Sequence, residues 1–302
     1  MDLLAGLFTY SALALVAVSF GVGIVVGLTG MGGGALMTPA LIFLGIPATA
    51  AVANDLVAAA VNKSVGAAVH WRSGSPNLAL AGWLIAGSVP TAAAGAFIVR
   101  AVGGDEHGDT FVTIAIGVAL LLAASTYVLR LIISLRRKGA MPSGDPAVRK
   151  VPTFLVGAVG GLLVGLTSVG SGSVIMVALL LLYPALSPVR IVGTDLLQAI
   201  PLVIAAAVGH VIVTGVDWLI LLPLLIGGPV GTFLGARLAS IVPQRVIRRG
   251  IVLVLTLTGL SLLDVPPVAV GIIGAGLLIL GPVAWALLRE RLAPTANEDP
   301  GY

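Results

Sequence analysis

Seven stretches of this chain contain no Asp, Glu, Lys, Arg or His. They cover residues 3–54, 73–99, 110–129, 151–189, 218–236, 250–263 and 265–288. A helix needs roughly 20 apolar residues to cross the hydrocarbon core of a bilayer, and most of these stretches offer that length. Across the chain only 9% of residues are charged and 58% are hydrophobic, whereas a soluble domain carries about 25% charged residues. The sequence therefore predicts an integral membrane protein.

We expect the membrane segments to be helical, because only a helix satisfies its own backbone hydrogen bonds in lipid. The expected helices cover about residues 5–28, 33–46, 48–70, 78–100, 110–135, 152–168, 171–184, 190–213, 217–240, 247–263 and 267–288. Two of them, 33–46 and 171–184, are short, and each follows or begins at a Gly-rich break. Each is either a short span or half of a re-entrant hairpin. The fold class is therefore all-α, with eleven spans or with seven spans and two hairpins.

The two halves of the chain repeat one another. Gly27-Leu28-Thr29 matches Gly165-Leu166-Thr167 at an offset of 138 residues. Two residues are then inserted, and at an offset of 140 Asp55 matches Asp195 and His70 matches His210. Because the chain has only three histidines, Asp and His matches at one shared offset indicate an internal duplication.

A basic linker, residues 136–150, divides the chain near its middle. It separates a first membrane repeat (1–135) from a second (151–265), which an additional helix (266–289) and a tail (290–302) follow. Basic loops stay cytoplasmic, so we place the linker inside. Counting spans outward from it places the N-terminus outside and the C-terminus inside. The repeats then enter the membrane from opposite sides, an inverted arrangement typical of alternating-access transporters and shared by some channels.

The Gly-rich breaks, residues 30–34 and 170–173, are the first candidate site. Such a break exposes backbone N–H groups at the start of the next helix, and helix N-termini bind anions. Two breaks related by inversion would meet near the bilayer midplane, where transporter sites are expected. The alternative is that these small residues serve only close helix packing. The candidate substrate ligands in the breaks are Gly32, Gly33, Gly34, Gly170, Ser171, Gly172 and Ser173.

Lys63 lies inside an expected span rather than at its end. A lysine within the membrane is costly and therefore indicates function by default, and its charge suits an anionic substrate. Its counterpart in the second repeat is Val203, so the predicted site is asymmetric. The alternatives are a snorkelling side chain or a structural pair with Asp55, roughly two helical turns away. The neighbouring Asn62 and, in the second repeat, Thr194 are further candidate substrate ligands.

Asp55 and Asp195 lie near the beginning of their spans. A carboxylate in a low-dielectric environment can carry a proton. Alternatively, Asp with Thr194 and glycine carbonyls could hold Na⁺. The two carboxylates are thus candidates for coupling transport to H⁺ or Na⁺. Helix N-capping explains an Asp near a helix start equally well.

His70 and His210 close the corresponding spans. An interfacial position near a helix C-terminal dipole is the simpler explanation, and a gating role is the alternative. We find no catalytic triad, metal-ligand spacing or phosphate-binding loop, and the chain has no cysteine, so the sequence predicts neither an enzyme nor a cofactor or metal. The net charge of +4 comes from basic residues at helix ends, which argues against nucleic acid as a partner.

Short motifs occur at matching places in the two halves. In the first half they are Gly27-Leu-Thr-Gly-Met-Gly-Gly-Gly-Ala-Leu-Met-Thr-Pro39, Asn62-Lys63 with His70, and Gly-Ser-Val-Pro90. In the second half they are Gly165-Leu-Thr-Ser-Val-Gly-Ser-Gly-Ser173, Gly193-Thr-Asp-Leu196, Gly209-His210, Gly215-Val-Asp-Trp218 and Gly-Gly-Pro-Val-Gly231. Over about residues 15–265 the chain resembles the TauE/SafE sulfite exporter family of prokaryotic membrane proteins.

The resemblance implies a secondary transporter of small anions in the cytoplasmic membrane, with sulfite or an organosulfonate such as sulfoacetate as the usual substrate. The chain departs from the family pattern at Asn62, where Thr is frequent, and at Asn77-Leu78, where Asp-Trp is frequent. If those positions touch substrate, its specificity differs. We expect transport by alternating access, with an anion channel of the same architecture as the alternative. The expected partners are the anion, the lipid bilayer, H⁺ or Na⁺ and, through 267–288, other helices or a homodimer mate.

Overall fold

The computed structural model describes residues 10–29, 33–70, 76–103, 107–136, 146–170, 172–238, 241 and 244–292. Within these residues the chain forms helices and no strands, which confirms the all-α prediction. The helices are α2 (Tyr10–Thr29), α3 (Gly34–Phe43), α4 (Ala48–His70), α5 (Leu78–Gly103), α6 (Gly108–Arg136), α7 (Lys150–Thr167), α8 (Val174–Leu182), α9 (Pro188–Val213), α10 (Trp218–Leu238), α11 (Gln244–Leu262) and α12 (Pro267–Leu292). Each matches an expected segment to within a few residues; residues 5–9 of the first segment lie outside the described residues.

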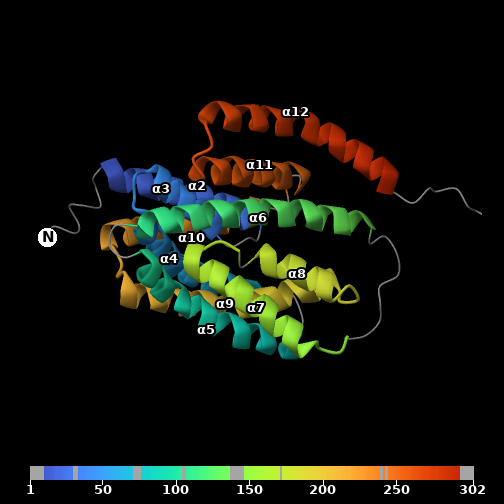
Figure 1. Ribbon diagram of the computed structural model, residues 1–302, viewed down its shortest axis with the longest axis horizontal. Coiled ribbons are helices and arrows are strands. Elements are labelled where there is room, and N and C mark those ends of the chain that lie inside the picture. The colour runs from blue at the N-terminus through green and yellow to red at the C-terminus, as the bar shows by residue number, and fades with distance from the viewer. Residues whose placement is uncertain are drawn as a thin grey trace, which may run out of the picture.

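Six of the described helices contain a stretch long and apolar enough to cross a membrane: α2, α5, α6, α7, α9 and α10. The short helices are different. With 10 residues in α3 and 9 in α8, they extend about 15 Å and about 14 Å, half of a hydrocarbon core about 30 Å thick. In Figure 1, α3 lies toward the left-hand end of the bundle and α8 toward the right-hand end.

The break between α7 and α8 reverses the chain inside the bundle. Ser168 has φ +59° and Gly170 has φ +120°, and this left-handed backbone ends α7 and turns the chain. The hydroxyl of Thr167 accepts a hydrogen bond from the Val169 backbone N–H and so holds the turn. Figure 1 shows α7 running inward from the right-hand edge and α8 returning toward that edge.

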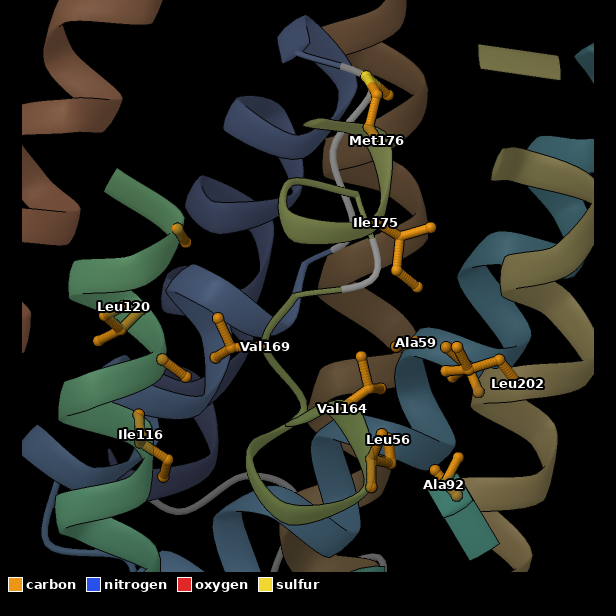
Figure 2. Packing of buried hydrophobic residues seen from close by; sticks show 14 of the residues in the cluster. Leu56, Ala59, Ala92, Ile116, Leu120, Val164, Val169, Ile175, Met176 and Leu202 are labelled. Atoms are coloured by element: carbon orange, nitrogen blue, oxygen red, sulfur yellow. The ribbon is translucent and has the colours of Figure 1, made fainter. Parts of the chain in front are cut away.

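Apolar side chains from both halves of the chain form one core around this break. Figure 2 shows Val164 and Val169, at the end of α7 and just beyond it, between Leu120 of α6 on one side and Leu202 of α9 on the other. Leu56 of α4 joins them from below. Residues 167–170, at the end of α7 and just beyond it, are therefore surrounded by packed helices and buried in the interior.

Two helix pairs pack with their backbones in close contact, α2 along α10 and α7 along α5. A Cβ atom added at Gly27 would meet the Thr232 carbonyl oxygen, and one added at Gly165 would meet that of Ala92, both closer than real side-chain contacts allow. Small residues are what permit helices in lipid to approach this closely. The two glycines open the Gly-Leu-Thr sequences that precede the breaks, so these pairs fix where the breaks lie.

Candidate functional site

The end of the first Gly-rich break lies against the segment that leads into the second. Gly34, the first residue of α3, faces the backbone of Ser168 so closely that a Cβ at position 34 would overlap the Ser168 carbonyl oxygen. Gly34 and Ser168 are both buried. The N-terminus of α3, which belongs to the first half, therefore lies directly against the end of α7, which belongs to the second.

Asp55 forms hydrogen bonds to residues on both sides of this contact. Its Oδ2 atom accepts hydrogen bonds from the Thr38 hydroxyl (2.6 Å) and from the Ser168 hydroxyl (2.8 Å). All three side chains are buried; Asp55 is 2% exposed. Thr38 lies on α3 and Ser168 just after α7, so one carboxylate on α4 links the segments that flank both breaks.

Asp195 has a different set of neighbours. It is 3% exposed, and its Oδ1 accepts a hydrogen bond of 3.0 Å from Gln198, one turn further along α9. Its charge interacts with those of Lys63 on α4 and Arg130 on α6. Lys63 is half-buried and interacts more strongly with Asp195 than with Asp55. Lys63 is thus within electrostatic range of both candidate coupling carboxylates.

Helix N-capping does not explain either aspartate. α4 begins at Ala48 and α9 at Pro188, so both carboxylates lie two turns inside their helices. The N-cap of α9 is Ser187, whose hydroxyl accepts from the Arg190 backbone N–H. Capping needs a side chain at the helix boundary, so the capping alternative is wrong for both residues.

Asn62 precedes Lys63 and lies against α10. Its amide nitrogen lies beside Gly228, at 3.1 Å from where a Cβ of that residue would be. Its Oδ1 atom is buried and has no hydrogen-bond partner. A buried acceptor without a partner is costly, which makes this amide a plausible contact for a bound molecule.

His210 is buried rather than interfacial. It is 1% exposed, its Nε2 lies 2.7 Å from the Gly165 carbonyl oxygen, and its Nδ1 is buried without a partner. The expected interfacial position is therefore wrong for His210, because α9 packs against α5 and α7 there. The contact ties α9 to the last turn of α7. The His70 side chain lies outside the described part of the chain, although its backbone ends α4.

Thr194 contacts a loop instead of a break. Its hydroxyl donates to the Arg190 carbonyl and accepts from the Asn77 backbone N–H. In a separate contact, the Asn54 Oδ1 atom of α4 accepts a hydrogen bond from the Asp217 backbone N–H. A cavity of about 440 Å³ opens beside Asn54; it is also lined by Ala50 and by the segment 214–219.

The remaining candidate ligands lie at the helix starts. Gly33 precedes α3, and its carbonyl accepts from the Leu36 and Met37 backbone N–H groups. Gly170, Gly172 and Ser173 precede α8, where the Gly170 carbonyl accepts from Val174. Gly32 and Ser171 lie outside the described residues.

The sulfite exporter TauE/SafE family model matches residues 15–262. The chain belongs to the TauE/SafE sulfite exporter family. It is 34% identical over 257 residues to the "Probable membrane transporter protein YjnA" of Bacillus subtilis (strain 168), a match covering 83% of this chain and all of that protein. It is 29% identical over 250 residues to "Probable membrane transporter protein YdhB" of the same organism, covering 82% and 99%. No solved structure gives a significant match.

The structure of this TauE/SafE family member adds site residues that sequence reasoning missed. Thr38 and Ser168 lie within the quoted Gly-rich motifs, but only the glycines and the later serines were singled out. Gln198 and Arg130 carry no motif, and only their contacts with Asp195 reveal them. A polar residue four positions after a glycine break was the available signal for Thr38. As a family member, the chain is a multi-pass membrane transporter.

Proposed function

We propose that this chain is a secondary transporter that moves a small anion across the cytoplasmic membrane by alternating access. Sulfite, or an organosulfonate such as sulfoacetate, is the substrate class that the family points to. The observation that carries the proposal is the buried contact of Gly34, in the first Gly-rich break, with Ser168, two residues before the second. The N-terminus of α3, beside a half-buried lysine on α4, suits an anion.

Contacts between the halves support a two-fold relationship between them. Gly27 packs on the Thr232 carbonyl and Gly165 on that of Ala92. The first pair maps onto the second at the offsets of 138 and 140 residues seen in the sequence. Gly23 with Gly228 and Gly161 with Ser88 are related in the same way. In an inverted-repeat transporter, each contact from the first repeat to the second has a matching contact from the second repeat to the first, and these glycine pairs are related in that way.

Two polar contacts follow the same rule. The Asn54 side chain accepts from the backbone N–H of residue 217, and the Thr194 side chain accepts from that of residue 77. Adding 140 to the residue numbers 54 and 77 of the first half gives 194 and 217 of the second, so each contact is the counterpart of the other. Because these residues lie on opposite halves in each pair, the repeats are interlocked, and a relative movement of the halves changes both contacts.

The proposed topology has two re-entrant hairpins, α2–α3 and α7–α8, and seven spans, which are α4, α5, α6, α9, α10, α11 and α12. In this proposal α2 and α7 do not cross the membrane, although each is long enough to do so. The half-length of α3 and α8 supports it. The basic linker 136–150 lies in the cytoplasm in this arrangement, with the N-terminus outside and the C-terminus inside.

In this function the backbone at the breaks, with Asn62 and Lys63, binds the anion. Asp55 and Asp195 couple its movement to a cation. His210, which ties α9 to the turn before the second break, contributes to gating.

Reconstitution in proteoliposomes tests the function. Flux is measured for a panel of sulfite, sulfate, sulfoacetate, taurine and simple carboxylates. We expect saturable flux driven by a gradient for at least one member of this panel. Large uncoupled anion currents would instead support a channel of the same architecture, and no flux of any member would contradict both.

Replacement of Lys63 tests the site. We expect Lys63→Ala to lower the flux of the transported anion at least tenfold, because a buried anion loses its positive partner. Lys63→Arg should retain part of it. Lys150→Ala is the matched control, since Lys150 is exposed at the start of α7. Unchanged flux and binding in Lys63→Ala would overturn the role of Lys63.

A further inference from the structure

The charged groups around the breaks balance one another. Lys63 interacts with Asp195 and Asp55, and Asp195 also interacts with Arg130 of α6. We call these four side chains the central charge cluster. Two acidic and two basic groups give it a formal charge of zero.

An anion bound against a neutral cluster adds a negative charge that nothing compensates. Burying an unpaired charge in a low-dielectric interior is far more costly than burying a pair. A cation that binds with the anion removes the imbalance. This step rests on the anion transport proposed above.

Asp55 is better suited than Asp195 to take that cation. Asp195 interacts with two basic groups, Lys63 and Arg130, and its Oδ1 is held by the Gln198 amide. Asp55 interacts with one basic group, Lys63, and its Oδ2 is met by two hydroxyl oxygens, those of Thr38 and Ser168. A hydroxyl can donate or accept, so these oxygens can turn from the carboxylate toward a cation.

We propose that the Asp55 carboxylate and the Thr38 and Ser168 hydroxyls form the binding site of one monovalent cation, H⁺ or Na⁺, that accompanies each anion. Both ions use the same oxygen chemistry. Na⁺ is coordinated by the three oxygens, whereas H⁺ binds the carboxylate, which then donates to a hydroxyl. Because Thr38 and Ser168 flank different breaks, the occupied site alters the link between the two halves.

The other charged groups near Asp55 are few within the described residues. The helices packed on α4 include α3, α6, α9 and α10. α3 carries no charged residue, α6 and α9 present Arg130 and Asp195 to the cluster, and the charged residue of α10 is the exposed Arg237 near its end. Lys63 is on α4 itself. Asp195 is therefore the acid whose contribution the test must separate from that of Asp55.

Thermal denaturation of the purified full-length protein tests the site without a known substrate. The melting temperature is followed while NaCl replaces choline chloride at constant ionic strength, at several values between pH 5.5 and pH 8.5. A rise with Na⁺ identifies Na⁺ as the ion, and a rise with acid alone identifies H⁺. We expect Asp55→Asn to lose the rise, with apparent cation affinity at least tenfold weaker. Asp264→Asn, at an exposed aspartate between α11 and α12, is the matched control and should retain the rise.

Ser168→Ala is a second variant, because it keeps the Asp55 charge and removes one of the three oxygens. We expect it to weaken the cation response several-fold if Na⁺ binds and to shift its midpoint pH if H⁺ binds. A wild-type protein that responds to neither ion overturns the proposal. A response that survives Asp55→Asn, or that Asp195→Asn alone abolishes, overturns it as well.

Flux separates this inference from the proposed function. Sulfite flux that depends on a Na⁺ or pH gradient supports both. Sulfite flux driven by membrane potential alone, with no cation dependence, supports transport and overturns the cation site. A cation response lost in Asp55→Asn, without flux of any anion in the panel, supports the site and contradicts the transport function.

Discussion

The two halves of this protein share a backbone arrangement and differ in the polar side chains around it. In both, a long helix, a Gly-rich break and a half-length helix are followed by a helix carrying an aspartate. In the first half that aspartate, Asp55, contacts hydroxyls from both breaks. In the second half Asp195 contacts the amide of its own helix neighbour Gln198. The same order of elements therefore surrounds two aspartates with chemically different side chains.

Residue identity at matching positions explains this difference. At the offsets found in the sequence, the counterparts of Thr38 and Ser168 are Ala178 and Gly30. Neither has a hydroxyl, so Asp195 cannot be held as Asp55 is. The glycine contacts between the halves are therefore alike, whereas the side chains around the two aspartates differ.

The largest expected effect lies where the halves meet. Gly34→Ala places a Cβ in the Ser168 backbone, which must shift, and we expect the free energy of unfolding to fall by about 3 kcal/mol, with loss of anion flux. Gly33→Ala is the matched control for stability, because its Cβ would meet only a Val26 methyl at 3.6 Å. The melting temperature in detergent and the anion flux are measured for both variants. Equal effects of the two variants would mean that the breaks do not touch.

A second pair of variants tests the likeness of the two halves. Gly27→Ala and Gly165→Ala each drive a Cβ into a carbonyl oxygen of the facing helix, on Thr232 and Ala92. We expect similar losses of about 2 kcal/mol each, measured by thermal denaturation. Gly21→Ala meets nothing within 4 Å and should leave stability unchanged or slightly raised. A loss confined to one of the two variants would break the proposed symmetry.

Helix positions were predictable because the charge-free stretches, and the polar residues that end them, can be located directly in the sequence. The expected and observed starts of α4 coincide at residue 48, and those of α5 at residue 78. A meeting of the breaks was predicted from the repeat, and what the structure gives is the contact of Gly34 with Ser168, two residues before the second break. The cost of a charge in the membrane identified Lys63 as a candidate site residue, and its role stays a prediction. Its stronger interaction with Asp195 than with Asp55 was not predictable.

Contacts between distant segments were not predictable. Asp55 and Ser168 are far apart in sequence, and a serine in an apolar loop gives no sign of its partner. His210 looked interfacial because it stands near a helix end, yet packing of α5 and α7 around it makes it buried. Such features depend on which helices pack together, information that periodicity and composition do not carry.

The smallest expected effect concerns the open ends of the hairpins. Tyr183, just after α8, is buried, and its hydroxyl accepts from the Arg149 backbone N–H at 2.8 Å and contacts the Thr153 hydroxyl. Tyr183 thus holds the end of α8 against the start of α7. Its counterpart at the offset of 140 is Phe43, which is 59% exposed.

Tyr183→Phe removes those hydrogen bonds and keeps the ring. We expect the free energy of unfolding to fall by about 1 kcal/mol, seen as a lower melting temperature. Phe43→Leu should change stability by less than about 0.5 kcal/mol, because the side chain is exposed. If the two changes had equal effects, the hairpins would be equally anchored. A larger effect of Tyr183→Phe would show that the second hairpin is tied to its own base, leaving the first as the more mobile partner of the pair.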